Sequence, residues 1–373
     1  MAVVPQEAID QFEALMEEEV DESLKRTFQP SGHLWMSPYV PYSELSVTQI
    51  SRSQLREIIL LTVQNIHQGY PCETLMRFLK AREGNVTRAH KMLVDCLNWR
   101  IQNDIDDMLA KPIVPIELYR GIRDSQLIGL SGYTNEGLPV FAVGVGLSTF
   151  DRASVHYYVQ SHIQINEYRD RVILPAATKK YGRHVSKCIK ILDMTGLKLS
   201  ALNQIKLMTI ISSIDDLNYP EKTLTYYIVN APYVFSACWK VVKPLLQERT
   251  RRKINVLSGC GQDDLLKIMN YSSLPHFCRK RCSGSSKHLH NNVDNCFSLD
   301  HPFHQQLYNY IKQQVLVCKP VEPVKQGSVH VTLPEDAAEG DIAKILESEL
   351  EKFEELQRCP ESLKDLKIID DKC

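Results

Sequence analysis

The feature that most restricts the fold is an alternation of short and long apolar segments between about residues 122 and 258. Short apolar runs bounded by turn residues predict strands at Pro139–Val145, Cys188–Met194, Leu224–Val229 and Ile254–Ser258. Helix-length segments alternate with them, at roughly 152–180, 200–215, 232–247 and 261–270. Strands joined through helices need crossover connections, which are right-handed and make neighbouring strands parallel. The sequence therefore predicts an α/β fold with a largely parallel sheet.

The regions on either side of this alternation differ from it in composition. Residues 44–112 carry apolar stripes at the helical period and predict an all-helical unit, which precedes the α/β unit at 113–318. Residues 1–43 are acidic and then rich in proline and serine, so we expect a tail. Residues 319–373 predict a linker followed by an acidic tail, in which an amphipathic helix or a short coiled coil is possible.

Bulk properties exclude several classes of protein. The 373 residues carry a formal net charge of −1, which does not favour nucleic acid as a partner. The longest aliphatic run, residues 58–63, is too short to cross a bilayer, and we expect no secretory signal. The 11 cysteines lie at irregular spacings, mostly in apolar runs, as is typical of reduced thiols. We therefore expect a cytoplasmic protein that contacts membranes only at their surface.

The most informative stretch runs from Tyr219 to Lys253. A charged loop leads into a buried strand, and the strand ends in Asn-Ala-Pro, where Pro232 suits the first turn of a helix. The following helix is apolar around most of its circumference, which is typical of a buried helix or of one that contacts an apolar phase other than protein. The apolar side chains that we single out are Val234, Phe235, Trp239, Val242, Leu245 and Leu246.

This stretch resembles the CRAL-TRIO lipid-exchange domain, and it is most similar to the phosphatidylinositol transfer proteins of fungi and plants. The similarity rests on Tyr-Pro-Glu-Lys at 219–222, Ile-Val-Asn-Ala-Pro at 228–232, Lys-Pro-Leu-Leu at 243–246 and Thr-x-x-Lys-Ile at 250–254. It continues upstream through Leu75–Arg82, and about 240 residues are covered in collinear order. The resemblance implies a helical N-terminal unit, an α/β/α lipid-binding domain, and a mobile gate helix at 232–247 that closes a pocket for two acyl chains.

The resemblance also implies a site for the phosphatidylinositol headgroup. The family's motif positions are occupied here by Arg82, Glu221, Lys222, Thr250 and Lys253. A lysine and a threonine hydroxyl can bind a phosphodiester, and a glutamate can accept hydrogen bonds from inositol hydroxyls. Each residue taken alone also fits an ordinary surface ion pair, which contributes little to stability.

The sequence departs from the family's pattern where some relatives bind phosphatidylcholine. The small hydroxyl residues used there are replaced by Cys188 and Lys190, and Asn166 lies near the position of a tyrosine. Lys222 stands where the family often has arginine, and a lysine cannot form a planar, two-pronged contact. We therefore expect an inositol-lipid site together with an altered choline-lipid site.

Two further groups of residues admit a functional interpretation. Arg249, Arg251 and Arg252 follow the predicted gate and suit contact with an anionic membrane surface. The histidines and cysteines at 276–296 do not have the paired spacing of a zinc site, so we expect no metal. The sequence lacks a Gly-x-Ser-x-Gly nucleophile motif, and we expect neither an enzyme nor a cofactor.

The sequence thus predicts a phosphatidylinositol carrier that exchanges its lipid between membranes or presents it to lipid-modifying enzymes such as phosphoinositide kinases. Two alternatives stay open. One is a carrier of another hydrophobic ligand, such as a tocopherol or a sterol, which would not need the headgroup residues. The other is a lipid-sensing adaptor that recruits a partner through its acidic tails.

Overall fold

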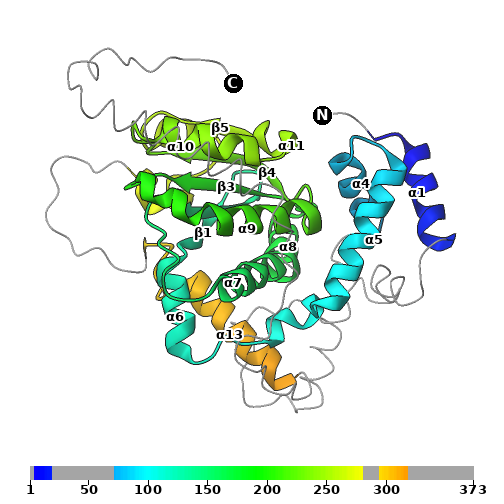
Figure 1. Ribbon diagram of the computed structural model, residues 1–373, viewed down its shortest axis with the longest axis horizontal. Coiled ribbons are helices and arrows are strands. Elements are labelled where there is room, and N and C mark those ends of the chain that lie inside the picture. The colour runs from blue at the N-terminus through cyan, green and yellow to red at the C-terminus, as the bar shows by residue number, and fades with distance from the viewer. Residues whose placement is uncertain (1–3, 19–70, 280–293, 318–373) are drawn as a thin grey trace, which may run out of the picture.

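A five-stranded sheet of order β1-β2-β3-β4-β5 forms the centre of the computed structural model, which describes residues 4–18, 71–279 and 294–317 (Figure 1). β1 pairs with β2 in antiparallel orientation, and the pairs from β2 to β5 are parallel. The predicted parallel sheet is therefore confirmed. The strands are β1 (Ile128–Tyr133), β2 (Pro139–Gly144), β3 (Cys188–Asp193), β4 (Thr223–Val229) and β5 (Ile254–Val256).

The two faces of the sheet have different neighbours because side chains alternate along each strand. Val140, Ile189 and Val229 point to one face and pack against the segment that contains α12 (Gln262–Leu265). On the opposite face, one row of cross-strand partners consists of Phe141, Lys190, Tyr226 and Ile254. This second face forms one wall of the cavity described below.

Helices between the strands provide the crossovers that parallel pairing requires. The helical elements of this part of the chain are α6 (Ile116–Ser125), α7 (Val155–Tyr168), the π-helical turn η2 (Arg169–Ile173), α8 (Leu174–Tyr181), η3 (Leu199–Gln204), α9 (Ile205–Asn218) and α13 (Pro302–Val317). α7 and α13 pack on β1, β2 and β3 through Phe141, Ile165, Tyr168 and Phe303.

The helical unit lies at one side of the sheet-containing body (Figure 1). It consists of α1 (Gln6–Glu18), α4 (Pro71–Ala81) and α5 (Val86–Gln102), followed by the turn η1 (Ile105–Ala110). The Asn85 side chain accepts a hydrogen bond from the Arg88 backbone N–H, which caps the start of α5.

The structure differs from the expected tail at the start of the chain. Ile9, Phe12 and Met16 form the buried stripe of α1 and pack with Leu75 and Leu93 of the helical unit. These apolar residues recur at helical spacing, so packing outweighs the acidic composition of the segment. The rest of the tail expected at 1–43 and all of that expected at 319–373 lie outside the described residues.

The segment predicted to form a gate helix at 232–247 is divided into shorter elements. α10 (Phe235–Val242) is followed by the 3-10 turn η4 (Lys243–Leu245) and by the short helix α11 (Glu248–Arg251). Pro244 lies in η4, where its missing N–H cannot continue the α-helical hydrogen-bond pattern.

β1 is the strand that the sequence does not indicate clearly, since it reads Ile-Gly-Leu-Ser-Gly-Tyr. A Cβ at Gly129 would collide with the Cys296 carbonyl oxygen, so close packing of two backbones requires glycine here.

Among the described residues, no helix is long and apolar enough to span a membrane.

Candidate functional site

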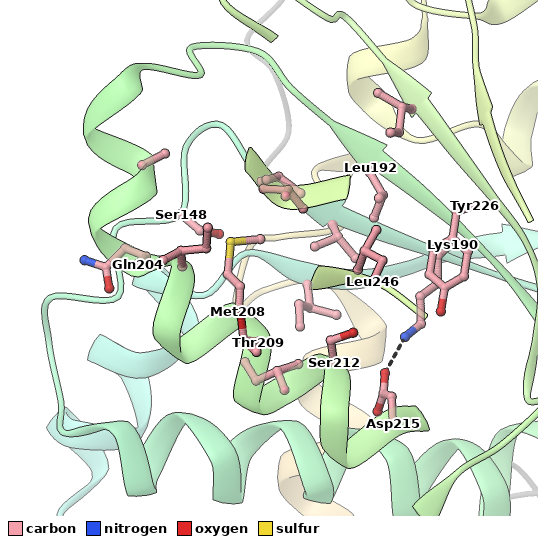
Figure 2. Close-up of a pocket in the computed structure, with 18 of the residues that line it drawn as sticks. Ser148, Lys190, Leu192, Gln204, Met208, Thr209, Ser212, Asp215, Tyr226 and Leu246 are labelled. Carbon is pink, nitrogen blue, oxygen red and sulfur yellow. Dashed lines mark hydrogen bonds and ion pairs between the residues drawn. The ribbon is translucent and has the colours of Figure 1, made fainter. Parts of the chain in front are cut away.

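A largely apolar cavity of about 290 Å³ lies between the sheet and two helices (Figure 2). Its sheet wall comes from β2, β3 and β4, including Leu192 and Ile228. α9 supplies the facing stripe with Ile205, Met208, Ser212 and Asp215, whose spacing puts them on one side of the helix. A cavity of this composition suits an elongated hydrophobic ligand.

The residues predicted to form the gate border this cavity. Of the six predicted side chains, five line it, namely Phe235, Trp239, Val242, Leu245 and Leu246. The rings of Phe235 and Trp239 stack with their centroids 5.8 Å apart. Val234 is buried in the core cluster beneath α10 instead. Five of the six side chains named from the sequence therefore border the cavity, and their role as a gate stays a prediction.

One end of the cavity carries a cluster of polar side chains (Figure 2). The Lys190 ammonium lies 2.9 Å from Asp215 Oδ2 and 5.7 Å from the centroid of the Tyr226 ring. Asp215 Oδ1 lies 2.7 Å from His162 Nε2 and accepts a 2.7 Å hydrogen bond from Asn166 Nδ2. The two positions predicted to form an altered choline site hold an ion-paired lysine, Lys190, and a buried thiol, Cys188.

The ionic states of this cluster are set by its members. Burial alone would raise the pKa of Asp215, but His162 and Lys190 hold it well below its ordinary value. Burial alone would lower the pKa of Lys190, but Asp215 raises it. The pair therefore stays charged in the physiological range, inside a mostly apolar cavity.

A small polar pocket adjoins the cavity and collects four of the five predicted headgroup residues. Lys253 Nζ lies 2.9 Å from Glu221 Oε2, and Thr250 Oγ1 donates a 3.0 Å hydrogen bond to Asp216. Glu221 has a φ of 61°, a left-handed conformation that costs energy for a residue with a Cβ. Five residues line both the cavity and the polar pocket, namely Arg169, Asp215, Asp216, Tyr226 and Thr250.

Two of the five predicted headgroup residues, Lys222 and Arg82, differ from the rest in their surroundings. Lys222 is 4 % exposed and pairs with Asp170 at 3.3 Å, although it lines the polar pocket. Burial, reinforced by Arg77, lowers the pKa of Lys222 to about 8. Arg82 does not line the pocket; it lies near Arg249, and burial together with Arg249 lowers its pKa.

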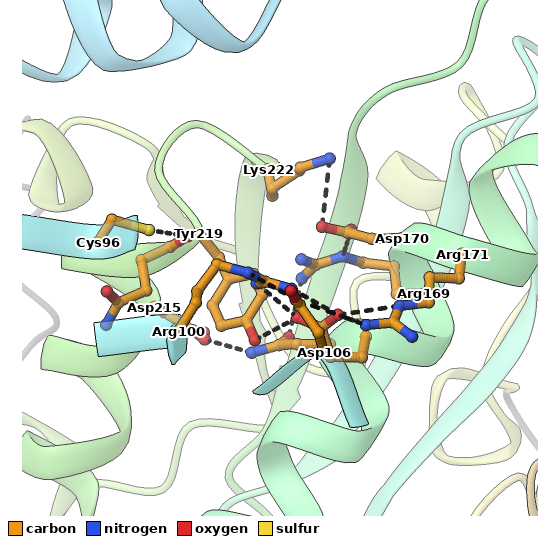
Figure 3. Close-up of polar contacts among 12 residues, drawn as sticks. Cys96, Arg100, Asp106, Arg169, Asp170, Arg171, Asp215, Tyr219 and Lys222 are labelled. Carbon is orange, nitrogen blue, oxygen red and sulfur yellow. Dashed lines mark hydrogen bonds and ion pairs between the residues drawn. The ribbon is translucent and has the colours of Figure 1, made fainter. Parts of the chain in front are cut away.

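An ionic network beneath the polar pocket attaches the helical unit to the sheet-containing domain (Figure 3). Arg100 of α5 contacts Glu167 at 2.9 Å and Asp106 at 2.6 Å. Glu167 also accepts hydrogen bonds from Tyr219 at 2.6 Å and from Arg171 at 2.8 Å. Burial alone would raise the pKa of Glu167, but the two arginines lower it, so these charges remain paired.

The predicted membrane-surface arginines are not equivalent in the structure. Arg249 donates to the backbone oxygens of Ala81 and Asp216 and so joins the ends of α4 and α9 to the gate segment. Arg251 and Arg252 pair with Glu248 instead. The Arg252 side chain is 72 % exposed, whereas that of Arg249 is 18 % exposed, so an inward position replaces the expected surface position of Arg249.

His162 and Arg169 are among the polar side chains that the sequence analysis did not single out. His162 lies four residues before Asn166 and Arg169 lies three residues after it, so the three share one face of α7 and η2. That spacing was visible, but nothing in it indicated that the face meets a cavity.

Among the described residues, no group of three or more histidine, cysteine or acidic side chains could hold a metal ion. Cys282, His288 and His290 lie outside them.

A parallel sheet that forms one wall of a long apolar cavity, with a polar pocket at its end, defines a class of proteins that bind amphipathic ligands. The CRAL/TRIO domain matches residues 123–278, and the CRAL/TRIO N-terminal domain matches residues 8–95. The chain therefore belongs to the CRAL-TRIO family, as its motifs predicted.

Similar proteins support this assignment. The phosphatidylinositol/phosphatidylcholine transfer protein SFH12 of Arabidopsis thaliana is 30% identical over 232 residues, which cover 58% of this chain and 40% of that protein. The SEC14 cytosolic factor of Kluyveromyces lactis is 28% identical over 283 residues, covering 73% of this chain and 88% of that protein. The alignments with SFH9 and SFH12 span only 38% and 40% of those plant relatives.

A solved structure has the same fold. The crystal structure of Sfh5 superimposes with a TM-score of 0.52 at 16% sequence identity, and it covers 85% of this chain and 99% of that one. At this identity, the likeness establishes the α/β architecture with its helical unit and says nothing about the ligand.

Proposed function

We propose that this protein binds phosphatidylinositol and carries or presents it, with the acyl chains in the cavity and the headgroup in the polar pocket. The observation that carries the proposal is the junction of the two spaces, which share Tyr226 and Thr250 among their lining residues. A diacyl lipid has the same division, with two long apolar chains joined to a polar group. The role is one of binding and transfer rather than catalysis, in keeping with the names of the relatives.

The cost of exposing acyl chains to water explains why a lipid carrier needs a covered cavity. Exposure of an acyl chain to water costs about 0.8 kcal/mol for each CH₂ group. A carrier must therefore cover both chains in transit and expose the cavity at a membrane. The segment from α10 to α11 is suited to this role because its apolar residues form the cover and its α-helix is interrupted at Pro244.

In this proposal, the headgroup replaces contacts that the polar pocket now makes within itself. Lys253 and Thr250 bind the phosphodiester, and Glu221 accepts hydrogen bonds from inositol hydroxyls. The Lys253–Glu221 pair joins two loop residues, so a ligand can separate them without disturbing the sheet. Two predicted headgroup residues do not contact the headgroup in this proposal. Lys222 is paired with Asp170, and Arg82 lies beside Arg249.

The site of lipid exchange in the cell is the next part of the proposal. We assign exchange to the cytoplasmic face of membranes, since one relative is named a cytosolic factor. Arg251 and Arg252, whose side chains are 34 % and 72 % exposed, lie at the end of the segment from α10 to α11 and suit an anionic lipid surface. The released or presented lipid is then available to lipid-modifying enzymes, among them phosphoinositide kinases.

The decisive experiment measures lipid uptake by the full chain from vesicles that contain phosphatidylinositol, read by native mass spectrometry. Lys253→Ala removes a charge-assisted contact with phosphate and should reduce uptake about 10- to 100-fold. Lys267→Ala is the matched control, because Lys267 is an exposed lysine that pairs with Asp264 away from both spaces. Uptake by the wild type of a sterol or tocopherol, but of no inositol lipid, would contradict the proposal.

A further inference from the structure

Lys190 interrupts an otherwise apolar and aromatic row of the sheet. Phe141, Lys190, Tyr226 and Ile254 are direct cross-strand partners on the face that lines the cavity. A lysine in such a row costs desolvation energy even when it is paired, and apolar replacements of buried ion pairs are often neutral or stabilising. Stability alone therefore gives no reason for a charge at this position.

The cluster presents unused hydrogen-bond donors to the cavity. Asp215 receives contacts from Lys190, His162 and Asn166, so much of the acceptor capacity of its carboxylate is used. The Lys190 ammonium has three N–H donors and makes one hydrogen bond within the described residues, to Asp215. The other donors remain for a ligand.

Arg169 adds an independent observation at the same end of the cavity. It is 2 % exposed and lines both the cavity and the polar pocket. Its Nε and Nη1 bond to Asp170 and Asn166, but Nη2 has no hydrogen-bond partner in the described part of the chain. A buried guanidinium with an unused donor favours an anionic oxygen nearby.

This donor-rich end is separate from the proposed inositol site. Lys190 lines the cavity but not the polar pocket, whereas Glu221 and Lys253 line the polar pocket but not the cavity. Figure 2 shows Lys190 pointing toward Asp215, beside Tyr226 and Ser212. The two lysines therefore belong to two sites that meet at residues which line both spaces.

We propose that Lys190 and Arg169 form a second binding site, for the phosphate or carboxylate of an anionic lipid whose chains occupy the cavity. The proposal rests on the proposed use of the cavity for lipid chains but not on inositol recognition. A quaternary ammonium group would meet the like charges of Lys190 and Arg169 here, so a choline headgroup is disfavoured. The ligand class is an anionic lipid with a small headgroup, either phosphatidic acid or a free fatty acid.

The test offers the full chain, stripped of lipid, three sets of phosphatidylcholine vesicles that contain phosphatidic acid, oleic acid or phosphatidylinositol. Native mass spectrometry of the recovered protein then identifies the bound lipid. The wild type should bind phosphatidic acid or oleic acid, and whichever is bound identifies the source of the anionic group. Lys190→Met should reduce that uptake by about tenfold and should reduce phosphatidylinositol uptake by a smaller factor.

The crossed control separates this proposal from the proposed function. Lys253→Ala should reduce phosphatidylinositol uptake and leave uptake of the small anionic lipid unchanged. A wild type that binds phosphatidylinositol but neither small anionic lipid would overturn the second site alone. A wild type that binds only the small anionic lipid would overturn the inositol site alone.

A double variant guards against loss of structure, because Lys190→Met leaves the Asp215 carboxylate without its cation. Lys190→Met/Asp215→Asn removes both charges and keeps similar side-chain volumes. If it folds as judged by circular dichroism and still fails to bind the small anionic lipid, the donor role of Lys190 is supported. Uptake equal to that of the wild type would mean that the ion pair is only structural, and the proposal would be wrong.

Discussion

Two lysine–carboxylate pairs with the same separation of 2.9 Å face the connected spaces of this protein, but they are built differently. Lys190–Asp215 joins a central strand to a helix, and His162 and Asn166 reinforce the carboxylate. Glu221–Lys253 joins two loop residues, and Glu221 is in a left-handed conformation. The first pair is part of the framework and offers spare donors, whereas the second can open to admit a ligand.

The largest expected effect is a difference in how much stability the protein loses when the carboxylate of each pair is removed. Asp215→Ala leaves Lys190 without its anion inside the protein and removes an acceptor from His162 and Asn166. We expect it to lower the free energy of unfolding by about 3–5 kcal/mol. Glu221→Ala removes a partly exposed loop pair and should cost less than about 1 kcal/mol. Urea unfolding followed by circular dichroism measures both.

Equal losses of stability from Asp215→Ala and Glu221→Ala would remove the distinction between a framework pair and an opening pair. The comparison needs the slope of the unfolding transition as well as its midpoint, since a changed slope would show that the folded or the denatured ensemble differs.

The second effect concerns Lys222, which follows Glu221 in the chain yet belongs to the framework. Its pKa is about 8 in the folded protein, against an ordinary value of 10.5. Below pH 8 Lys222 is protonated in both the folded and the unfolded protein, so the folded protein bears the whole desolvation cost of the buried ammonium. Between about pH 8 and 10.5 the folded state loses its proton first, so stability contributed by this group rises with pH.

Lys222→Met removes this titration, so the difference in unfolding free energy between the variant and the wild type isolates it from the tyrosines and cysteines that also titrate. The wild type gains stability over this range and the variant does not, so the unfolding free energy of Lys222→Met relative to the wild type should fall by about 1–3 kcal/mol from pH 8 to pH 10.5. A difference that stays constant over this range would contradict the lowered pKa and place Lys222 in a solvated, ligand-facing position.

The sequence predicted the parts of this comparison unequally. β2 to β5 were predicted from apolar runs, and the motif between Tyr219 and Lys253 brought Glu221, Thr250 and Lys253 to one pocket. The framework pair could not be predicted, because Lys190 and Asp215 lie on separate elements and neither residue carries a signal for the other. β1 was missed because its glycines serve close backbone packing rather than strand propensity.

The helix α1 was missed for a different reason. Ile9, Phe12 and Met16 recur at helical spacing and were visible, but the acidic composition of the segment suggested a tail. Burial of one apolar stripe against α4 and α5 is enough to order a helix whose opposite face is charged. Periodicity was therefore the better guide than composition at this position.

The smallest expected effect tests whether Glu221 is held in place at a cost. Its φ of 61° suits glycine, which has no Cβ to oppose the left-handed conformation. Glu221→Gly should therefore be about 0.5–1 kcal/mol more stable than Glu221→Ala in thermal or urea unfolding. Both variants lack the carboxylate, so both should lose inositol-lipid uptake to the same extent.

This pair of variants separates backbone strain from recognition at one position. If the glycine variant is more stable while uptake falls equally in both, the loop maintains an unfavourable conformation in order to present an acceptor to the headgroup. If the glycine variant is no more stable than the alanine variant, the left-handed backbone costs little. The ease with which the Glu221–Lys253 pair opens must then come from its position on loops alone.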